Sequence, residues 1–266
     1  MISRIIIAAA LMCAISLVEA AEENSTFPAA GIEGISIKIP AGEITLVGNE
    51  TNEIHVEQQF TFNGSTNSNR ENCAVTFKTY SGVLTYIASH NNGQHCKVNL
   101  RLTAPKGLSV RVFSGMGPVR VSGFAQAVGV DVKIGNIQLQ EIGGDNLNIT
   151  ARSGSISGKD IKAKNIKVDC NLGDINLEGL TGTADVFNHN GRIALGWEHA
   201  PKSGIVDIRS SKGNVSLTFP VDARFVSKIK ADPKTLTNEF NQSAPDGFSL
   251  NIKASLGEVK LLKPRI

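Results

Sequence analysis

The sequence predicts an all-β protein: a parallel β-solenoid with coils of about 18–22 residues and a less regular N-terminal part that could be antiparallel. Two observations carry this prediction. A glycine-centred pattern occurs nine times, and short segments alternate apolar with polar residues. The composition agrees, because 26 glycines and only 5 % aromatic residues favour short strands joined by many turns.

The repeat has the form Φ-x-Φ-x4-G-x-Φ-x-Φ, where Φ is an apolar residue. In the copy around Gly173, for example, Ile166 and Val168 are the two apolar residues before the glycine. In the middle of the chain successive glycines are separated by 18, 19, 19, 18 and 22 residues, whereas the outer separations are 40, 35 and 44. The nine glycines of the pattern are Gly42, Gly82, Gly117, Gly135, Gly154, Gly173, Gly191, Gly213 and Gly257.

Alternation with a period of two places the apolar residues of each segment on one face of a strand. At ~3.3 Å per residue a coil is roughly 60 Å long, enough to wind once around an aliphatic core. The glycine then forms a corner, because it reaches φ > 0 without a steric penalty. The competing interpretation is an antiparallel meander in which each glycine turns a hairpin, and "NHNGRI" at residues 188–193 is a fair turn signal. We favour the solenoid because the residue after the glycine varies freely, whereas two-residue hairpins require particular pairs.

The two ends of the chain are less regular than its middle. Residues 54–62 and 98–102 alternate and read as strands, with a polar loop over residues 63–72. We expect this region to cap the solenoid, since a bare first coil would expose an unpaired edge. Residues 219–247 break the period, and we expect the last copy, around Gly257, to close the other end.

The first 20 residues, MISRIIIAAALMCAISLVEA, have the pattern of a secretory signal peptide, with a basic residue, an apolar run and small residues before Ala21. We expect cleavage after Ala20; an uncleaved N-terminal anchor is the alternative. No other run approaches the ~18 apolar residues of a membrane span, so we expect no integral span in the mature chain. The expected organisation is a signal peptide (1–20), an N-terminal β region (21–104) and, continuous with it, the solenoid repeats (105–266).

Charge and cysteine content restrict the possible partners. The net charge of +3 is too small and too evenly spread to indicate nucleic-acid binding. After cleavage three cysteines are left, and their spacing fits no zinc site, so we expect neither a metal nor a cofactor. In an oxidising compartment Cys73 and Cys96 could form a disulfide, or both could be free thiols. Cys170 is expected to be buried.

The segment "LTAPKGLSVRVFSGMGPVRVSG" (residues 102–123) and repeats such as "ARSGSISG" and "CNLGDINLEG" resemble a bacterial family of secreted β-strand-repeat proteins. Its members are labelled "putative adhesin" or domain of unknown function. The resemblance covers roughly residues 35–261 and rests on the general pattern of the repeat, not on any invariant motif. It implies a location in the cell envelope and a structural or binding role, and it supplies no catalytic or ligand residues.

The positions six and four before each central glycine should share one exposed face. Asp169, Asp185 and Asp207 occupy such positions on successive coils, and a carboxylate pair is what a glycoside hydrolase needs. The simpler interpretation is a solvated face of alternating charges. Trp197 could be a platform for a sugar ring, although we expect it to fill its own coil. The residues expected on this face are Arg111, Phe113, Asp131, Asn148, Thr150, Lys167, Asp169, Asp185, Phe187, Asp207 and Arg209.

The sequence contains no G-x-S-x-G, phosphate loop, dinucleotide fingerprint or H-E-x-x-H, and we assign no catalytic residue. We therefore expect a non-enzymatic exported protein, periplasmic or at the cell surface, that acts as a structural or adhesion-type module. Its partner would be a surface glycan or an envelope protein. The alternatives are a carbohydrate-active enzyme that uses Asp169, Asp185 and Asp207, and a scaffold that stacks end to end.

Overall fold

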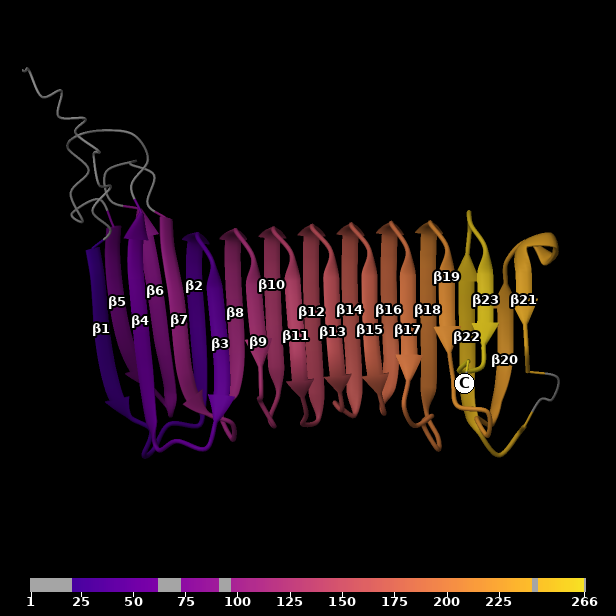
Figure 1. Ribbon diagram of the computed structural model, residues 1–266, viewed down its shortest axis with the longest axis horizontal. Helices are drawn as coiled ribbons and strands as arrows, with labels where there is room; N and C mark the ends of the chain where they lie inside the picture. Colours follow the sequence, from indigo (N-terminus) through magenta and orange to yellow (C-terminus); the bar gives the residue numbers. More distant parts are fainter. Residues whose placement is uncertain (1–20, 62–72, 91–96, 241–243, 266) are drawn as a thin grey trace, which may run out of the picture.

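The computed structural model describes residues 21–61, 73–90, 97–240 and 244–265, which form two facing β-sheets (Figure 1). These residues contain no α-helix, and one short 3-10 helix, η2 (Pro233–Thr235), lies near the C-terminal end. Sheet A has 12 strands, in the spatial order β1 (Ala21–Pro28), β4 (Glu53–Thr61), β7 (Lys97–Pro105), β3 (Ile44–Asn49), β9 (Val119–Ser122), β11 (Ile137–Ile142), β13 (Ile156–Ile161), β15 (Ile175–Leu180), β17 (Ile193–Trp197), β19 (Val215–Thr218), β23 (Val259–Leu262) and β21 (Leu236–Asn238). Sheet B has 11 strands, in the order β20 (Phe225–Lys230), β22 (Phe248–Ala254), β18 (Ile205–Lys212), β16 (Thr183–Asn190), β14 (Asn165–Leu172), β12 (Asn146–Ser153), β10 (Val128–Ile134), β8 (Ser109–Met116), β2 (Gly34–Ala41), β6 (Val83–His90) and β5 (Cys73–Tyr80).

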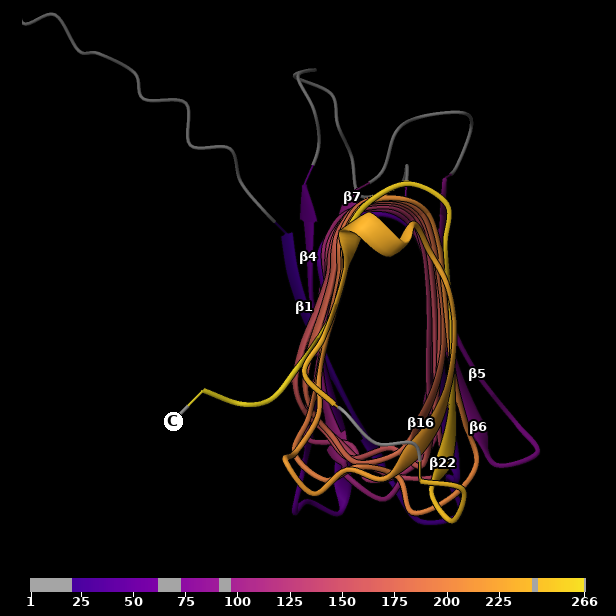
Figure 2. The ribbon, with the colours of Figure 1, turned by 90° about the vertical axis from the view of Figure 1, so that its right-hand side faces the viewer.

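From β8 to β19 each coil consists of one strand of sheet B followed by one strand of sheet A. β10 pairs in parallel with β8 and β12, and β11 pairs in parallel with β9 and β13. Viewed along the axis, the coils superpose as a flattened ring (Figure 2). The predicted parallel solenoid is confirmed, and the antiparallel meander is wrong for this part of the chain.

Constant register stacks the apolar residues of successive coils into columns. Val128, Leu147 and Ile166 are neighbours on β10, β12 and β14, and all three are buried. The inward side chains of sheets A and B meet in one continuous hydrophobic core that runs through the described part of the chain. An inner coil is therefore covered by a neighbouring coil on each side as well as by its own facing strand.

Eight of the nine glycines in the pattern form a column at the corner between sheet B and sheet A. Their φ angles lie between +126° and +150°, a region that side chains disfavour. The stacking is also tight: a Cβ atom on Gly173 would lie 2.2 Å from the carbonyl oxygen of Gly154, and one on Gly191 would lie 2.0 Å from that of Gly173. Backbone conformation and close approach both require glycine here. The eight are Gly42, Gly117, Gly135, Gly154, Gly173, Gly191, Gly213 and Gly257.

The residue after each corner glycine connects neighbouring coils. The side-chain oxygens of Asn136 and Asn214 accept backbone N–H groups from the next coil, at 2.9 and 3.0 Å. Asp174 accepts the backbone N–H of Arg192 at 2.8 Å and also pairs with its guanidinium at 2.7 Å. Asp174 is thus a partnered carboxylate that holds two coils together.

Gly82 does not belong to the corner column, so this prediction is wrong. It lies with Ser81 in the turn of the β5–β6 hairpin, whose strands pair antiparallel from Cys73↔His90 to Tyr80↔Val83. Both turn residues have positive φ, +47° at Ser81 and +73° at Gly82, as tight hairpins of this kind require. The connection between β6 and β7 contains residues 91–96, outside the described residues.

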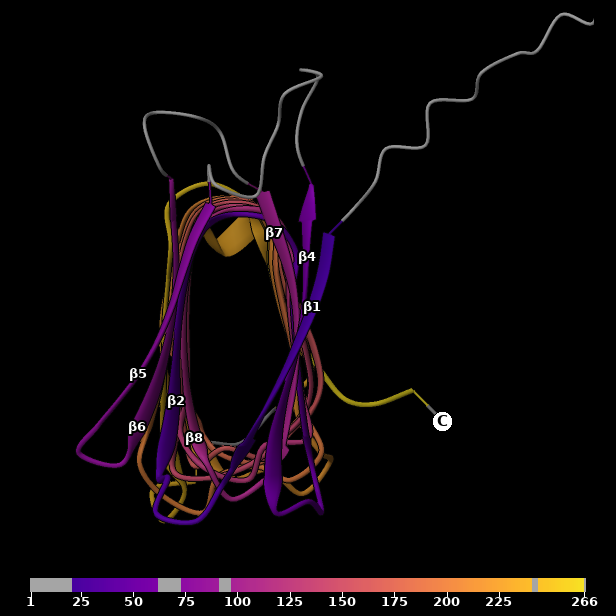
Figure 3. The ribbon, with the colours of Figure 1, turned by 90° about the vertical axis from the view of Figure 1, so that its left-hand side faces the viewer.

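At the N-terminal end the spatial order of the coils departs from the order of the chain. The first coil, β2–β3, pairs directly with β8 and β9, and the later strands β6 and β7 stack on its other side (Figure 1). β4 pairs antiparallel with β7, and β1 pairs antiparallel with β4 at the edge of sheet A (Figure 3). The antiparallel N-terminal part is confirmed. The division of the mature chain at residue 104, near the end of β7, stays a prediction.

The C-terminal end shows the same departure. β20, η2 and β21 build the outermost coil, and the chain then returns to insert β22 and β23 between this coil and β18–β19. In this coil η2 stands where the other coils have a corner glycine (Figure 2). The Thr235 hydroxyl donates to the carbonyl oxygen of Gly257 at 3.3 Å. The expectation that the last repeat closes this end is wrong, because the irregular segment closes it.

Aromatic side chains gather near the two ends. At the N-terminal end Phe77 contacts both Phe27 and Tyr86, with ring centroids 4.9 and 5.2 Å apart. At the C-terminal end Phe219 stacks on Trp197 with centroids 4.3 Å apart, and three further phenylalanines complete the cluster: Phe225, Phe240 and Phe248.

Residues 1–20, the expected signal peptide, lie outside the described residues. In the part of the chain that is described, no helix combines the length and the apolar character needed to cross a membrane.

Candidate functional site

The outer face of sheet B, here named face B, carries the residues that the sequence placed on one exposed face. Strand alternation and constant register arrange them in two rows along the solenoid axis. The first row contains Ser36, Arg111, Gly129, Asn148, Lys167, Asp185, Asp207, Asn251 and Lys228. The second row contains Lys38, Phe113, Asp131, Thr150, Asp169, Phe187, Arg209, Lys253 and Lys230.

Asp185 and Asp207 are neighbours on β16 and β18, as the spacing predicts. Arg209 lies between them, 2.5 Å from Asp185 and 3.4 Å from Asp207, and its guanidinium lies over the ring of Phe187 at 5.8 Å. The hydrogen bond that Arg209 donates to Asp185 is the main cause that raises the pKa of Arg209, and the charges of Asp185, Asp207 and Asp169 add to it. Both adjacent carboxylates of this cluster are therefore already paired with the same arginine.

Asp169 lies across Phe187 from Arg209, in the same row. Asp169 lies on β14, two strands across the sheet from Asp207 on β18, and in the other row, so the three aspartates do not converge on one point. The structure therefore brings together two of the three predicted carboxylates.

Trp197 is only 4 % exposed, and its indole N–H donates to the carbonyl oxygen of Gly182 at 2.9 Å. A buried indole cannot serve as a surface platform for a sugar. Cys170 is fully buried, and burial raises the pKa of its thiol to about 11, which leaves it protonated and unreactive. Cys73 is buried and disulfide-bonded. Cys96 lies outside the described residues, so the pairing of these two cysteines stays a prediction.

A hollow of about 630 Å³ lies on face B over β2, β6, β8, β10 and β12. It includes Gly129 of the first row, which has no side chain, and a Cβ atom there would meet nothing closer than 3.9 Å. The polar and aromatic residues that line the hollow are Ser36, Thr85, Ser109, Arg111, Phe113, Asp131, Asn148 and Thr150.

The hollow at Gly129 differs from the Arg209 cluster because its charged side chains are not engaged in ion pairs among the described residues. Arg111 and Asp131 are exposed, and among the described residues neither has an ion-pair partner. Phe113 is 39 % exposed and lies between this hollow and a second one of about 510 Å³ that Lys38, Asp131 and Lys133 also line. Unpaired charges beside an exposed aromatic ring are available to a ligand.

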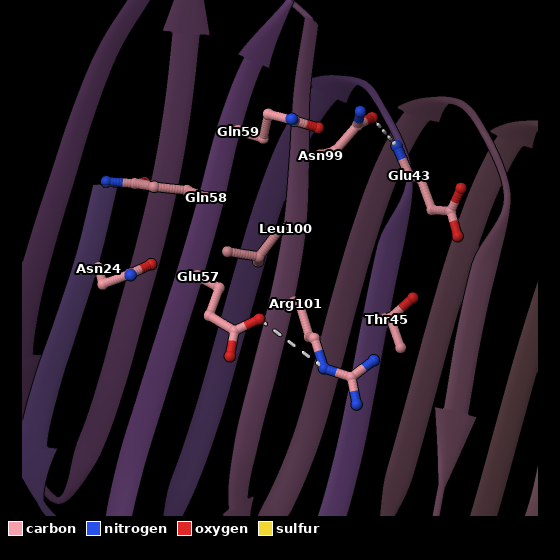
Figure 4. Close-up of a pocket in the computed structure, with 9 residues that line it drawn as sticks. All are labelled: Asn24, Glu43, Thr45, Glu57, Gln58, Gln59, Asn99, Leu100 and Arg101. Carbon is pink, nitrogen blue, oxygen red and sulfur yellow. Dashed lines mark hydrogen bonds and ion pairs between the residues drawn. The ribbon is translucent and has the colours of Figure 1, made fainter. Parts of the chain in front are cut away.

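A third depression, of about 320 Å³, lies on the outer face of sheet A at the N-terminal end (Figure 4). Its charged groups are already paired: Arg101 lies 3.8 Å from Glu57, and Glu43 bonds to Arg120. Asn99 accepts the backbone N–H of Glu43 at 3.1 Å. These mutual contacts make it a weaker candidate than the hollow at Gly129.

The sequence contains one signal for the hollow that its motifs did not reveal. Six positions before the corner glycine, the central copies carry Arg, Asn, Lys or Asp, whereas the copy of Gly135 carries Gly129. A glycine inside a strand often marks a place where a ligand or another backbone approaches closely. In the described residues, no group of three or more His, Cys, Asp or Glu side chains could hold a metal ion.

Comparison with known proteins agrees with this architecture. The model of the family described as Toastrack DUF4097 matches residues 32–236. A solved structure from Bacteroides fragilis NCTC 9343, described as a putative adhesin, has a TM-score of 0.53 at 13 % identity and covers 91 % of this chain and 97 % of its own.

Two solved structures from Parabacteroides distasonis ATCC 8503 are less similar. One, described as a putative adhesin, has a TM-score of 0.44 at 14 % identity, with coverage of 92 % of this chain and 98 % of its own. The other, described as a putative lipid binding protein, has a TM-score of 0.42 at 14 % identity, with coverage of 91 % and 96 %. No curated protein matches the chain. At these identities the likeness concerns the fold alone.

Proposed function

The chain belongs to the Toastrack DUF4097 family, and on this premise we propose that it is an exported, non-enzymatic binding module of the bacterial cell envelope. Its partner is a surface glycan or another envelope protein, and face B is the surface that contacts it.

The hollow at Gly129 is the observation that carries the proposal. It combines an exposed aromatic ring, one unpaired cation and one unpaired carboxylate on a rigid two-sheet scaffold. Sites on strands are held in place more firmly than sites on loops, so recognition there costs little ordering of the protein.

Export is supported by the signal-peptide pattern of residues 1–20 and by the disulfide-bonded state of Cys73. Disulfides persist in oxidising compartments such as the periplasm and the cell surface. The description of the Bacteroides fragilis protein as a putative adhesin fits a binding role that requires no catalytic residues.

The competing function is a carbohydrate-active enzyme that uses Asp169, Asp185 and Asp207. Arg209 holds both Asp185 and Asp207 in ion pairs, whereas a general acid or nucleophile must be free to exchange a proton or attack. The structure gives no observation in favour of this alternative.

Export is tested by expressing the full chain in a bacterial host, fractionating the cells and measuring the mass of the purified product. The expected product begins at Ala21 and lies outside the cytoplasm. A full-length chain in the cytoplasmic fraction would overturn the proposed location.

Binding is tested by applying the exported protein to an array of bacterial surface glycans and to purified envelope proteins. We expect saturable binding to at least one component, without turnover of it. Cleavage of a bound glycan would overturn the non-enzymatic assignment, and the lack of binding to every component would overturn the binding role.

A further inference from the structure

We propose that the hollow at Gly129 is a binding site for an acidic saccharide, with its carboxylate at Arg111, its ring against Phe113 and its hydroxyl groups at Asp131, Asn148 and Thr150. This inference rests on the proposed function and names the ligand class for it. The volume of about 630 Å³ lies in the range usual for small-molecule sites.

Arg111 is the residue that binds the carboxylate of the saccharide. Its side chain lies along the position of the missing Gly129 side chain, with Cγ and Nε both 3.9 Å from where a Cβ atom would be. Arg111 lines the hollow, and its guanidinium has no carboxylate partner among the residues that the structure describes. A planar guanidinium with parallel N–H groups matches the two oxygens of a carboxylate.

Phe113 supplies the contact for the ring of the sugar. A pyranose ring presents C–H groups on one face, and the negative face of an aromatic ring attracts such weakly positive hydrogens. Phe113 is 39 % exposed and is the neighbour of Asp131 in the second row, so a ring stacked on it lies within reach of that carboxylate.

The polar groups of the hollow favour a saccharide over other acidic ligands. Asp131 accepts hydrogen bonds from hydroxyl groups, and Asn148 and Thr150 both donate and accept them. The carboxylate of Asp131 repels a multiply charged anion, which disfavours phosphate. Arg111 and Asp131 lie diagonally across the hollow, on β8 and β10, so one end of the site selects an acid and the other selects hydroxyl groups.

The experiment measures the binding of oligosaccharides of glucuronic acid and of glucose, with inorganic phosphate and a zwitterionic dipeptide as further probes. Binding to the exported protein is followed by amide chemical shifts. We expect the acidic oligosaccharide to bind at least about tenfold more tightly than the neutral one, with shifts in β8, β10 and β12. Equal affinity for both oligosaccharides would overturn the role of Arg111. Phosphate or the dipeptide binding as tightly as the glucuronic acid oligosaccharide would overturn the saccharide assignment.

Gly129→Val should occupy the hollow and preserve the fold, because φ at Gly129 is not positive and nothing lies closer than 3.9 Å to the new Cβ. We expect it to weaken binding at least about tenfold at an unchanged melting temperature. The matched control is Gly196→Val, an equally open glycine in β17 of sheet A, which should leave binding intact. Arg111→Gln should lower the affinity for the acidic oligosaccharide to that for the neutral one.

The failure of this inference is distinguishable from the failure of the proposed function. If the protein binds an envelope component and Gly129→Val leaves that binding unchanged, the site assignment is wrong while the binding role stands. If the exported protein binds no envelope component and no probe, both are wrong.

Discussion

Between β8 and β19 the coils follow one another in space as they do in the sequence, whereas at both ends the chain places an outer coil out of order. The central coils are filled by aliphatic columns and turned by a column of glycines. The terminal coils are filled by aromatic clusters, and at the C-terminal end a 3-10 helix stands at the corner in place of a glycine.

The difference shows how a solenoid ends. An inner coil is covered on both sides, so identical residues can repeat from coil to coil. A terminal coil has a neighbour on one side only, and its backbone edge and apolar surface need another cover. At the C-terminal end the chain first forms the outermost coil and then returns to insert β22–β23 beneath it. The outermost coil is thus held by its pairing with β22–β23 and by the chain segments that connect to it before and after. These irregular ends also disfavour end-to-end stacking of the whole protein.

Replacing a corner glycine in the centre should have the largest effect. Gly173→Ala places a Cβ 2.2 Å from a backbone carbonyl oxygen at a φ of +145°, so two coils must separate. Strain of about 1–3 kcal/mol and overpacking of about 1–3 kcal/mol together predict a loss of about 4 kcal/mol, measured by urea denaturation. Gly196→Ala, at an open position, is the control and should be neutral or slightly stabilising. A neutral Gly173→Ala would refute the steric role of the column.

Removing an aromatic ring from the C-terminal end should come next and should act locally. Phe219 is fully buried against Trp197, Phe225, Phe240 and Phe248, and Phe219→Ala should cost about 3 kcal/mol, the lower end for a buried aromatic ring. We expect faster hydrogen exchange in β20 to β23 and unchanged exchange in β10 to β14, because stability in stacked repeats is local. Uniformly faster exchange would show that the end and the centre unfold as one unit.

A smaller effect is expected at the N-terminal end, where a buried polar chain connects the two sheets. The hydroxyl of Tyr86 donates to Gln58 at 2.9 Å, and the amide of Gln58 donates to Glu23 at 3.2 Å. Burial, with a further contribution from Glu23, raises the pKa of Tyr86. Tyr86→Phe leaves the Gln58 oxygen without its donor and should cost about 1–3 kcal/mol in thermal unfolding. An unchanged melting temperature would mean that water replaces the hydroxyl.

The smallest effect concerns a contact between central coils and depends on pH. Hydrogen bonds from Arg192 hold the pKa of Asp174 below its usual value. Because the folded pKa is the lower one, the stabilisation is fully present above the unfolded pKa of about 3.9 and is lost as the pH falls through the folded pKa. The Asp174 side chain is 43 % exposed, so Asp174→Asn should cost at most about 1 kcal/mol at pH 7. The cost should shrink as the pH falls below about 3.9, and a cost independent of pH would exclude the charge as its cause.

The regular part of the fold and the composition of face B could be read from the sequence. Six of the eight column glycines occur at spacings of 18–22 residues, and with a constant spacing the positions six and four before each glycine fall into rows. Gly82 fits the same template by chance, and the template contains no information on whether a glycine turns a hairpin or joins two sheets. The depth of the hollow at Gly129 depends on how Arg111 and Phe113 border it, which a one-dimensional pattern does not contain.

The sequence by itself determined the parallel winding, the inward and outward faces of each strand and the column of corner glycines. These features follow from the alternation of apolar and polar residues within each strand and from the period that neighbouring coils share. Each copy of the repeat therefore carries enough information to form one coil in register with its neighbours. The tertiary structure decided the insertion of β22–β23, the burial of Trp197 and the pairing of Asp185 and Asp207 with Arg209. These features depend on contacts between coils and on the covering of the exposed backbone edge at each end. Such contacts join residues that are distant in the sequence, so they stabilise the protein only after the coils have stacked.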